Sequence, residues 1–168
     1  TNSLIRRIRD PFGAEVVQDW FEASETNAPA YPRSLKTVTD KRGLVTSFLY
    51  DDRGNVTNTI VRGDLLGDGN TNTTAVTVSL FNANNLPTQT VDASGTTNLF
   101  FYTNTWLLAR QEIWPVNATA AQAIVNLYEY DNATNGTEAS YGLRTREIRA
   151  AGSSDAAKAL MGKTVSMI

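Results

Sequence analysis

One stretch of sequence decides the fold: it reads TDKRGLVTSFLYDDRGNVT and runs from Thr39 to Thr57. Two Asp-x-x-Gly groups, Asp40–Gly43 and Asp51–Gly54, flank a run of β-branched and aromatic residues that ends at Tyr50. Asp at the first position of a type I turn hydrogen-bonds its own downstream backbone, and Gly at the fourth position adopts positive φ without strain. The stretch therefore predicts a β-strand with a hairpin corner at each end.

The same corner recurs along the chain. In three copies an aromatic residue follows ten positions after the Asp, at Trp20, Tyr50 and Tyr102. In a looser copy Asn replaces both corner residues, and Asn is the best substitute for Gly where φ is positive. A repeat of this kind predicts an all-β chain of stacked antiparallel β-hairpins. The predicted corner residues are Asp10, Gly13, Asp40, Gly43, Asp51, Gly54, Asn82, Asn85, Asp92 and Gly95.

Three runs between the corners have the length and composition of strands. We expect strands over Leu44–Tyr50, Val76–Phe81 and Thr96–Tyr102, each spanning roughly 20 Å. The first and the last of these runs carry bulky apolar residues at successive positions near their ends. Side chains alternate between the two faces of a sheet, so these strands are expected to be covered on both faces.

Two segments depart from the repeat. Residues 64–75 are mostly Gly, Asp, Asn and Thr, which predicts a loop inserted at a corner. Residues 154–162 start with Ser and end with Gly around an Ala-rich run, which predicts a short helix. We therefore expect residues 1–150 to form the β-hairpin repeats and residues 151–168 to form a C-terminal extension of a short helix plus a strand.

The composition excludes several classes of function. The chain of 168 residues has a formal net charge of -2, with neither Cys nor His. Without these two residue types there is no disulfide, no thiol or imidazole catalysis and no Cys- or His-ligated zinc. The absence of a basic field argues against nucleic-acid binding. No apolar run is long enough for a membrane span, so we expect none. We also expect no cofactor.

With corners and aromatics placed, the pattern resembles the YD repeat of RHS proteins. The repeat is about 20 residues long, with an Asp-x-x-Gly turn, a Tyr-x-Tyr-Asp strand end and a second turn. Residues 39–57 follow it almost throughout, and Thr90–Tyr102 follows it with Thr103 in place of the next Asp. The likeness extends from Leu4 to Arg149, while residues 150–168 match nothing in the repeat.

The resemblance implies a function as well as a fold. Members of this family look like spirals of antiparallel hairpins that form a shell and are secreted or displayed on the cell surface. By resemblance, this chain is a non-catalytic segment of such a shell or solenoid, located outside the cell or at its surface. Its expected partners are further repeats of a longer parent chain, an encapsulated cargo, or copies of itself that add through strand pairing to a fibre or tube.

The first alternative is an adhesin-like module that binds surface glycans or a receptor. Flat aromatic side chains stack on sugar rings, which makes Trp106 and Trp114 candidates for ligand stacking. The tripeptide Arg62-Gly63-Asp64 at the base of the inserted loop has the form that integrins read. Oxygen ligands in a Gly-rich loop are typical of calcium sites, so Asp64, Asp68 and Asn70 are metal candidates, although Leu66 stands where a ligand belongs.

The second alternative is a carboxylate-based glycosidase, which needs two converging carboxyl groups. Asp51 and Asp52 are adjacent in sequence, so on a strand they would point to opposite faces. A catalytic Ser/Lys pair is a further possibility, because Ser and Lys residues occur near the C-terminus, Lys158 and Lys163 among them. We expect no enzyme and no catalytic residue.

Overall fold

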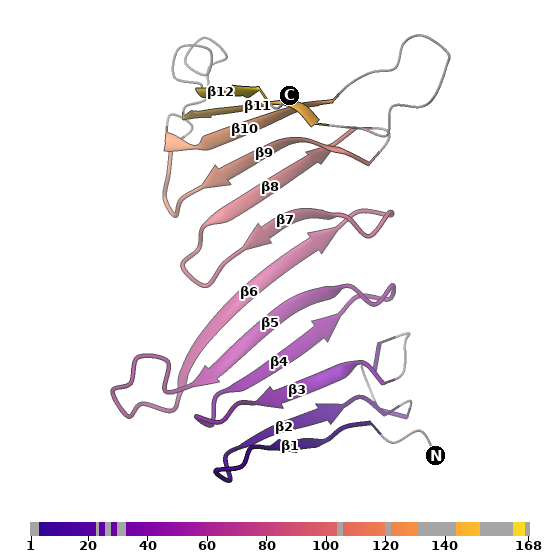
Figure 1. Ribbon diagram of the computed structural model, residues 1–168, viewed down its shortest axis with the longest axis vertical. Helices are drawn as coiled ribbons and strands as arrows, with labels where there is room; N and C mark the ends of the chain where they lie inside the picture. The colour runs from indigo at the N-terminus through magenta and orange to yellow at the C-terminus, as the bar shows by residue number, and fades with distance from the viewer. Residues whose placement is uncertain are drawn as a thin grey trace. The chain divides into compact units, whose positions relative to one another are not determined.

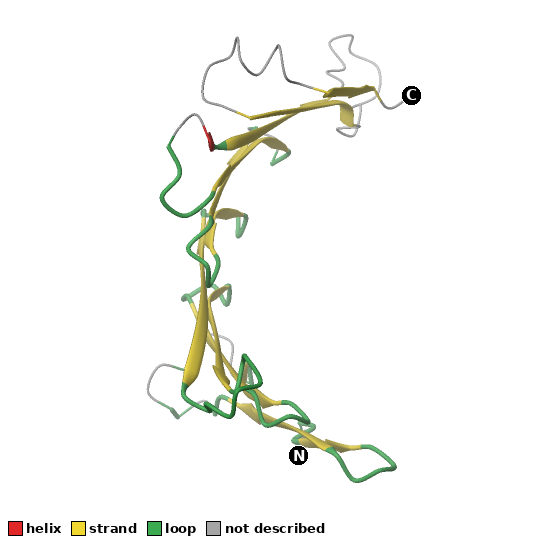
Figure 2. Cartoon of the chain, turned by 90° about the vertical axis from the view of Figure 1, so that its left-hand side faces the viewer, coloured by secondary structure: helices red, strands yellow, loops and turns green. Residues whose placement is uncertain are grey.

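The computed structural model describes residues 4–22, 24–25, 28–29, 33–103, 106–119, 122–130, 144–151 and 163–166. The chain divides into two compact units, unit 1 (Thr1–Asn85) and unit 2 (Leu86–Ile168). Apart from a helical turn at Gln122, the regular structure of the described residues consists of β-strands (Figure 2). The prediction of an all-β chain is confirmed.

Each unit contains six strands that are neighbours in the order in which they follow in sequence (Figure 1). All the pairings described within the units are antiparallel. The strands of unit 1 are β1 (Arg7–Arg9), β2 (Glu15–Trp20), β3 (Leu35–Thr39), β4 (Val45–Tyr50), β5 (Val56–Gly63) and β6 (Thr73–Phe81). Those of unit 2 are β7 (Pro87–Val91), β8 (Thr97–Tyr102), β9 (Leu108–Trp114), β10 (Ile124–Tyr130), β11 (Arg144–Ala151) and β12 (Lys163–Ser166). Both units are therefore series of β-hairpins, as the repeat predicts.

The observed ends of β4 and β8 lie within one residue of the predicted ends. Strand β6 begins at Thr73, three residues before the expected start at Val76. The reason is tertiary: Thr73, Thr74 and Ala75 pair with the end of β5, where Gly63 is the partner of Thr73. The inserted loop is accordingly shorter than expected and occupies residues 64–72.

The same irregularity recurs near the ends of four strands. At the last residue of β2, β4, β8 and β10 the register shifts by one residue, each time in the pairing with the following strand. Such β-bulges increase the local twist of a sheet and re-aim side chains. The four shifted positions are Asp19/Trp20, Leu49/Tyr50, Phe101/Tyr102 and Glu129/Tyr130.

The described residues bury few apolar side chains. Among them only Phe21, Ala123 and Val125 are buried hydrophobic residues. Leu49 in β4 and Phe101 in β8 remain 46% and 44% exposed. The expectation that these strands are covered on both faces is therefore wrong for the part of the chain that the structure describes, because these two residues remain exposed.

The expected C-terminal helix at residues 154–162 lies outside the described residues. The strand expected beyond residue 150 is present as β12, which pairs antiparallel with β11. The boundary between the β-hairpin repeats and the C-terminal extension, between residues 150 and 151, stays a prediction.

Candidate functional site

The corner aspartates organise their turns by the same set of hydrogen bonds. At Asp40 the backbone carbonyl accepts a bond from the Gly43 N–H at 2.9 Å. Its Oδ1 atom accepts two more, from the backbone N–H of Arg42 at 2.8 Å and of Leu44 at 3.0 Å. The same three bonds recur at Asp10, Asp51 and Asp92. The carboxylates thus satisfy turn N–H groups that would otherwise need water.

These contacts stabilise the charged form of each carboxylate. The pKa of Asp40 is lowered even though desolvation raises it, because hydrogen bonds from Leu44 and Arg42 outweigh that cost. The pKa values of the other corner aspartates are also lowered. The largest causes are the hydrogen bond from the Lys41 side chain at Asp10, the Asn55 amide at Asp51 and the Ser94 hydroxyl at Asp92.

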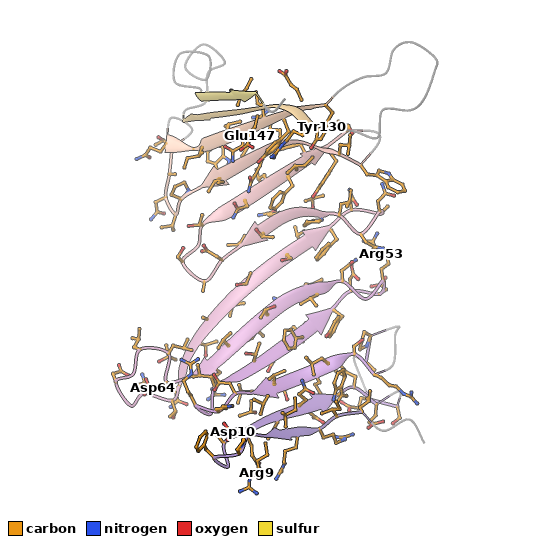
Figure 3. All side chains as sticks on the ribbon, in the orientation of Figure 1. Arg9, Asp10, Arg53, Asp64, Tyr130 and Glu147 are labelled. Atoms are coloured by element: carbon orange, nitrogen blue, oxygen red, sulfur yellow. The ribbon has the colours of Figure 1, made fainter. Side chains whose placement is uncertain are left out.

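Neighbouring corners also bond to one another along the edges of unit 1. The Lys41 ammonium donates to Asp10 Oδ2 at 2.6 Å and so joins the corners of the first two hairpins. At the opposite edge the Asn55 amide donates to Asn85 Oδ1 at 2.9 Å, and Arg53 donates to the Asn82 carbonyl at 2.7 Å. Figure 3 shows Asp10 and Arg53 at the two opposite edges of the unit. The predicted corner residues of unit 1 therefore form two rows rather than one site.

The aromatic residue that ends β2, β4, β8 and β10 donates a hydrogen bond to a backbone carbonyl at the start of the preceding strand or just before it. The Tyr50 hydroxyl at the end of β4 donates to the carbonyl of Leu35, the first residue of β3, at 2.7 Å. Three further residues repeat this contact: Tyr102 to the Pro87 carbonyl at 2.8 Å, Tyr130 to the Leu108 carbonyl at 2.8 Å, and the Trp20 indole to the Ile5 carbonyl at 2.9 Å. We call these four contacts the aromatic clasps. The ten-residue spacing from Asp marked three of the four residues without revealing their partners.

The inserted loop is held by its own acidic and amide side chains. Asp64 accepts bonds from the backbone N–H groups of Asp68 and Gly69, at 3.0 and 2.9 Å. Asp68 accepts from the Asn70 N–H at 2.9 Å, and Asn70 accepts from the Asn72 N–H at 3.1 Å. In the described part of the chain no cluster of three or more acidic side chains is arranged to hold a metal ion. The oxygens of the three metal candidates thus act as acceptors for the loop backbone.

The Arg-Gly-Asp tripeptide is built into the end of β5. Gly63 is buried and pairs with Thr73, and its φ is +145°. Both carboxylate oxygens of Asp64 are used by the loop backbone, and the Arg62 guanidinium donates to Asn72 Oδ1 at 3.0 Å. The motif is therefore not presented on an exposed loop tip.

The two candidate tryptophans lie at opposite ends of β9 and form no common platform. Trp106 is 64% exposed and occupies the positive-φ position of a corner, at φ +69°, where the other corners have Gly or Asn. Its N–H bonds to the carbonyl of Thr103 at 3.0 Å, so Thr103 replaces the Asp. Trp114 instead donates its indole N–H to Glu112 at 2.9 Å. The repeat placed Thr103 at this corner, but it did not reveal that Trp106 takes the positive φ, because Trp is not a usual residue at that turn position.

The acid pair and the Ser/Lys candidates are not brought together as catalytic groups by the described residues. Asp51 is occupied as a corner residue, with its Oδ1 accepting from two backbone N–H groups. Of the Ser/Lys candidates, Lys158 lies outside the described residues, and Lys163 is described only as the first residue of β12.

The inserted loop and the adjoining sheet face line a half-open pocket of about 660 Å³ in unit 1. The strand part of the lining is set by register: Ile60 and Arg62 alternate along β5 and lie opposite Ser47 and Val45 of β4. The corner of the β3–β4 hairpin and the loop supply the rest. These further lining residues are Arg42, Gly43, Gly63, Asp64, Thr71 and Asn72. No motif in the sequence predicts this pocket, because it needs the corner, the two strands and the loop in their folded positions.

The described part of the chain contains no apolar helix of membrane-spanning length. No protein-family model matches the chain, and no curated protein matches its sequence. Among solved structures, the chain is similar to a chain in the structure titled "Crystal Structure of TcdB2-TccC3-Cdc42", with 13% sequence identity and a TM-score of 0.41. The match covers 82% of this chain and 9% of that one, so this chain spans less than a tenth of the length of the protein it matches.

Proposed function

We propose that this chain is a non-catalytic structural segment of a secreted or surface-displayed YD-repeat protein. In this role it acts as a piece of shell wall or as a self-assembling scaffold, by pairing its strands with further repeats or with other copies. The observation that carries the proposal is the strand order: within each unit every strand pairs only with its neighbours in sequence. A sheet built in this way grows by one hairpin at a time, and its stability is a sum of neighbour interactions.

The edge strand β1 supports strand addition. The Gln18 N–H donates to the Arg6 carbonyl at 2.8 Å, and the Asp10 N–H donates to the Ala14 carbonyl at 3.0 Å. Bonded residues alternate along an antiparallel strand, so the backbone groups of Arg7 and Arg9 point away from β2. Both side chains lie near Glu15, at 3.2 and 3.8 Å, which reduces the repulsion that two cations would impose on an incoming strand.

Two substitutions at one position test this proposal. Arg7→Pro removes an outward N–H and leaves the bonds to β2 in place, because proline is tolerated where an edge N–H faces solvent. Arg7→Ala loses the same contact with Glu15 but keeps the N–H, and is the matched control. We expect sedimentation and negative-stain electron microscopy to show concentration-dependent fibres, tubes or shells for the unaltered chain and the Ala variant, and monomers for the Pro variant.

A monodisperse monomer at all concentrations for the unaltered chain would contradict self-assembly. Assembly that is equally strong in the Pro variant would place the contact elsewhere than at β1. The non-catalytic part of the proposal is tested by turnover assays on surface polysaccharides, for which we expect no product.

A further inference from the structure

The pocket beside the inserted loop has features that a wall segment does not need. The β1–β2, β3–β4 and β4–β5 corners of unit 1 are tight Asp-x-x-Gly turns, and an Asn-x-x-Asn turn follows β6. The β2–β3 connection runs over residues 21–34, and the β5–β6 connection runs over residues 64–72. The loop is ordered by the chain of bonds from Asp64 through Asp68 and Asn70 to Asn72. Thr73 adds a bond from its hydroxyl to the Asn70 carbonyl at 3.2 Å. The wall of the pocket is therefore largely formed before any ligand arrives.

Arg62 is the cation that this pocket leaves without an acidic partner. Its guanidinium bonds to the neutral amide oxygen of Asn72 at 3.0 Å, and no ion pair joins it to a carboxylate among the described residues. Asp64 also lines the pocket, but its two oxygens accept backbone N–H groups of the loop. A guanidinium has five N–H donors in a planar fork, so Arg62 retains donors for a second acceptor.

The rest of the lining is mixed in polarity. Val45 and Ile60 supply apolar surface from the sheet, while Ser47 and Thr71 supply hydroxyl groups. A second guanidinium, that of Arg42, stands at the corner and donates through Nε and Nη2 to Asp40, at 3.1 and 3.0 Å. The volume of about 660 Å³ lies within the usual range for small-ligand sites. Arg42 is paired with Asp40, and Asp64 carries a negative charge, so Arg62 is the one cation of this lining whose remaining donors can bind an oxyanion.

We propose that this pocket binds a small hydroxylated molecule that carries an oxyanion, either a carboxylate or a phosphate. Arg62 holds the oxyanion, since the guanidinium fork matches two oxygens of either group. Ser47, Thr71 and Asn72 bond to the hydroxyl groups, and Val45 and Ile60 contact the apolar face of the carbon skeleton. This site is independent of strand addition at β1, so either proposal can fail without the other.

Isothermal titration calorimetry on the full chain tests the site with four probes: glucuronate, glucose 6-phosphate, glucose and inorganic phosphate. We expect saturable binding of at least one of the two sugar anions and no saturation by glucose. Which anion binds more tightly distinguishes a carboxylate from a phosphate as the natural group. Binding should weaken as salt is raised, because the contact with Arg62 is ionic and partly open to solvent.

Two variants and one control identify the residues responsible. Arg62→Gln should weaken the bound sugar anion by at least about tenfold, the usual effect of losing a hydrogen bond to a charged group. Arg9→Gln removes the same charge from an exposed site outside the pocket and should leave the affinity unchanged. Replacing residues 64–72 by Asp-Lys-Arg-Gly-Leu, a copy of residues 40–44, removes the loop wall and should abolish binding with the sheet intact by circular dichroism.

Four results would overturn the proposal. They are the absence of saturation by both sugar anions, glucose binding as tightly as glucuronate, inorganic phosphate binding as tightly as glucose 6-phosphate, and equal affinity in the Arg62→Gln variant and the unaltered chain. A loss of affinity in Arg9→Gln equal to that in Arg62→Gln would also overturn it, because the effect would then be one of net charge alone.

Discussion

At the scale of single residues, the corner carboxylates link the stability of the chain to pH. The pKa of each corner aspartate is below its ordinary value of 3.8. The unfolded chain therefore binds protons more tightly than the folded chain does at these positions. The stabilisation is complete at pH values above the unfolded pKa and is lost as pH falls through the folded values.

We accordingly expect the thermal midpoint to be level near neutral pH and to fall below pH of about 4. The variant Asp40→Asn, Asp51→Asn, Asp92→Asn keeps a turn acceptor at each corner, as Asn82 does naturally, but removes three titrating groups. Thermal unfolding followed by circular dichroism between neutral and strongly acidic pH should show a smaller fall for this variant. An equal fall in both proteins would mean that other carboxylates are responsible.

Gly63 is the residue at which a single added carbon should be most damaging. A Cβ built there would lie 2.6 Å from Leu44 Cδ2 and 3.4 Å from Leu44 Cα, and φ is +145°. At Gly67 φ is also positive, at +74°, but nothing lies within 4 Å of an added Cβ. We expect Gly63→Ala to lower the free energy of unfolding by about 2 kcal/mol or more, and Gly67→Ala by about 1 kcal/mol. Urea titration measures both, and equal losses would show that the Leu44 contact is unimportant.

At the scale of the strand pair, the aromatic clasp explains why an aromatic residue with a polar hydrogen ends β2, β4, β8 and β10. Strand β6 ends in Phe81, which has no such hydrogen. The clasp bonds the last residue of one strand to the first residue of the strand before it, beside the bulge that faces the strand after it. A bulge disrupts the ladder locally, and the side-chain bond supplies a further tie at that end of the hairpin.

Tyr50→Phe should therefore destabilise the chain by about 0.5–1.5 kcal/mol, because it removes the bond to the Leu35 carbonyl and keeps the ring. The ring packs edge-on against Phe21, with centroids 6.2 Å apart, and that contact is retained. Ser79→Ala is a suitable control, since this half-buried hydroxyl has no side-chain bond among the described residues. Urea unfolding that gives the same loss for both variants would rule out the clasp as a source of stability.

At the scale of the whole molecule, the chain leaves apolar side chains in water on a face of its sheet. Leu49, Val76 and Leu80 are 46%, 37% and 51% exposed. The register places them on one face of unit 1, because Leu49 lies opposite Asn58 and Asn58 lies opposite Val78, between Val76 and Leu80. Clustered apolar exposure favours association with other surfaces.

Changing Leu49, Val76 and Leu80 together to Thr should keep the sheet, since Thr suits β-strands. The variant should bind less of a fluorescent apolar dye and should associate less in sedimentation experiments. Unchanged dye binding would show that this face is not the apolar surface that causes association. Matched circular dichroism spectra confirm that the fold is intact.

The hairpin repeat was readable from local chemistry. Asp at a turn start and Gly at its end act within four residues, so the corners at Asp40 and Asp92 need no tertiary information. The corner at Thr103 was readable from the repeat, but the positive φ of Trp106 was not, because Trp is not a usual residue in that conformation. The early start of β6 was not readable either, because it depends on how residues 73–75 pair with the end of β5. The pocket beside the inserted loop could not be predicted from the sequence either.

Local turn chemistry and strand alternation in the sequence determined that this chain is a succession of antiparallel hairpins. Only the tertiary structure decided what the side chains between the corners contact. It brought the Leu35 carbonyl of β3 to Tyr50, placed the exposed Arg62 beside Asn72 at a pocket, and left Leu49 and Phe101 exposed. The physical reason is range: a turn is made by neighbours in sequence, whereas register, bulges and burial are made by strands that meet only after folding.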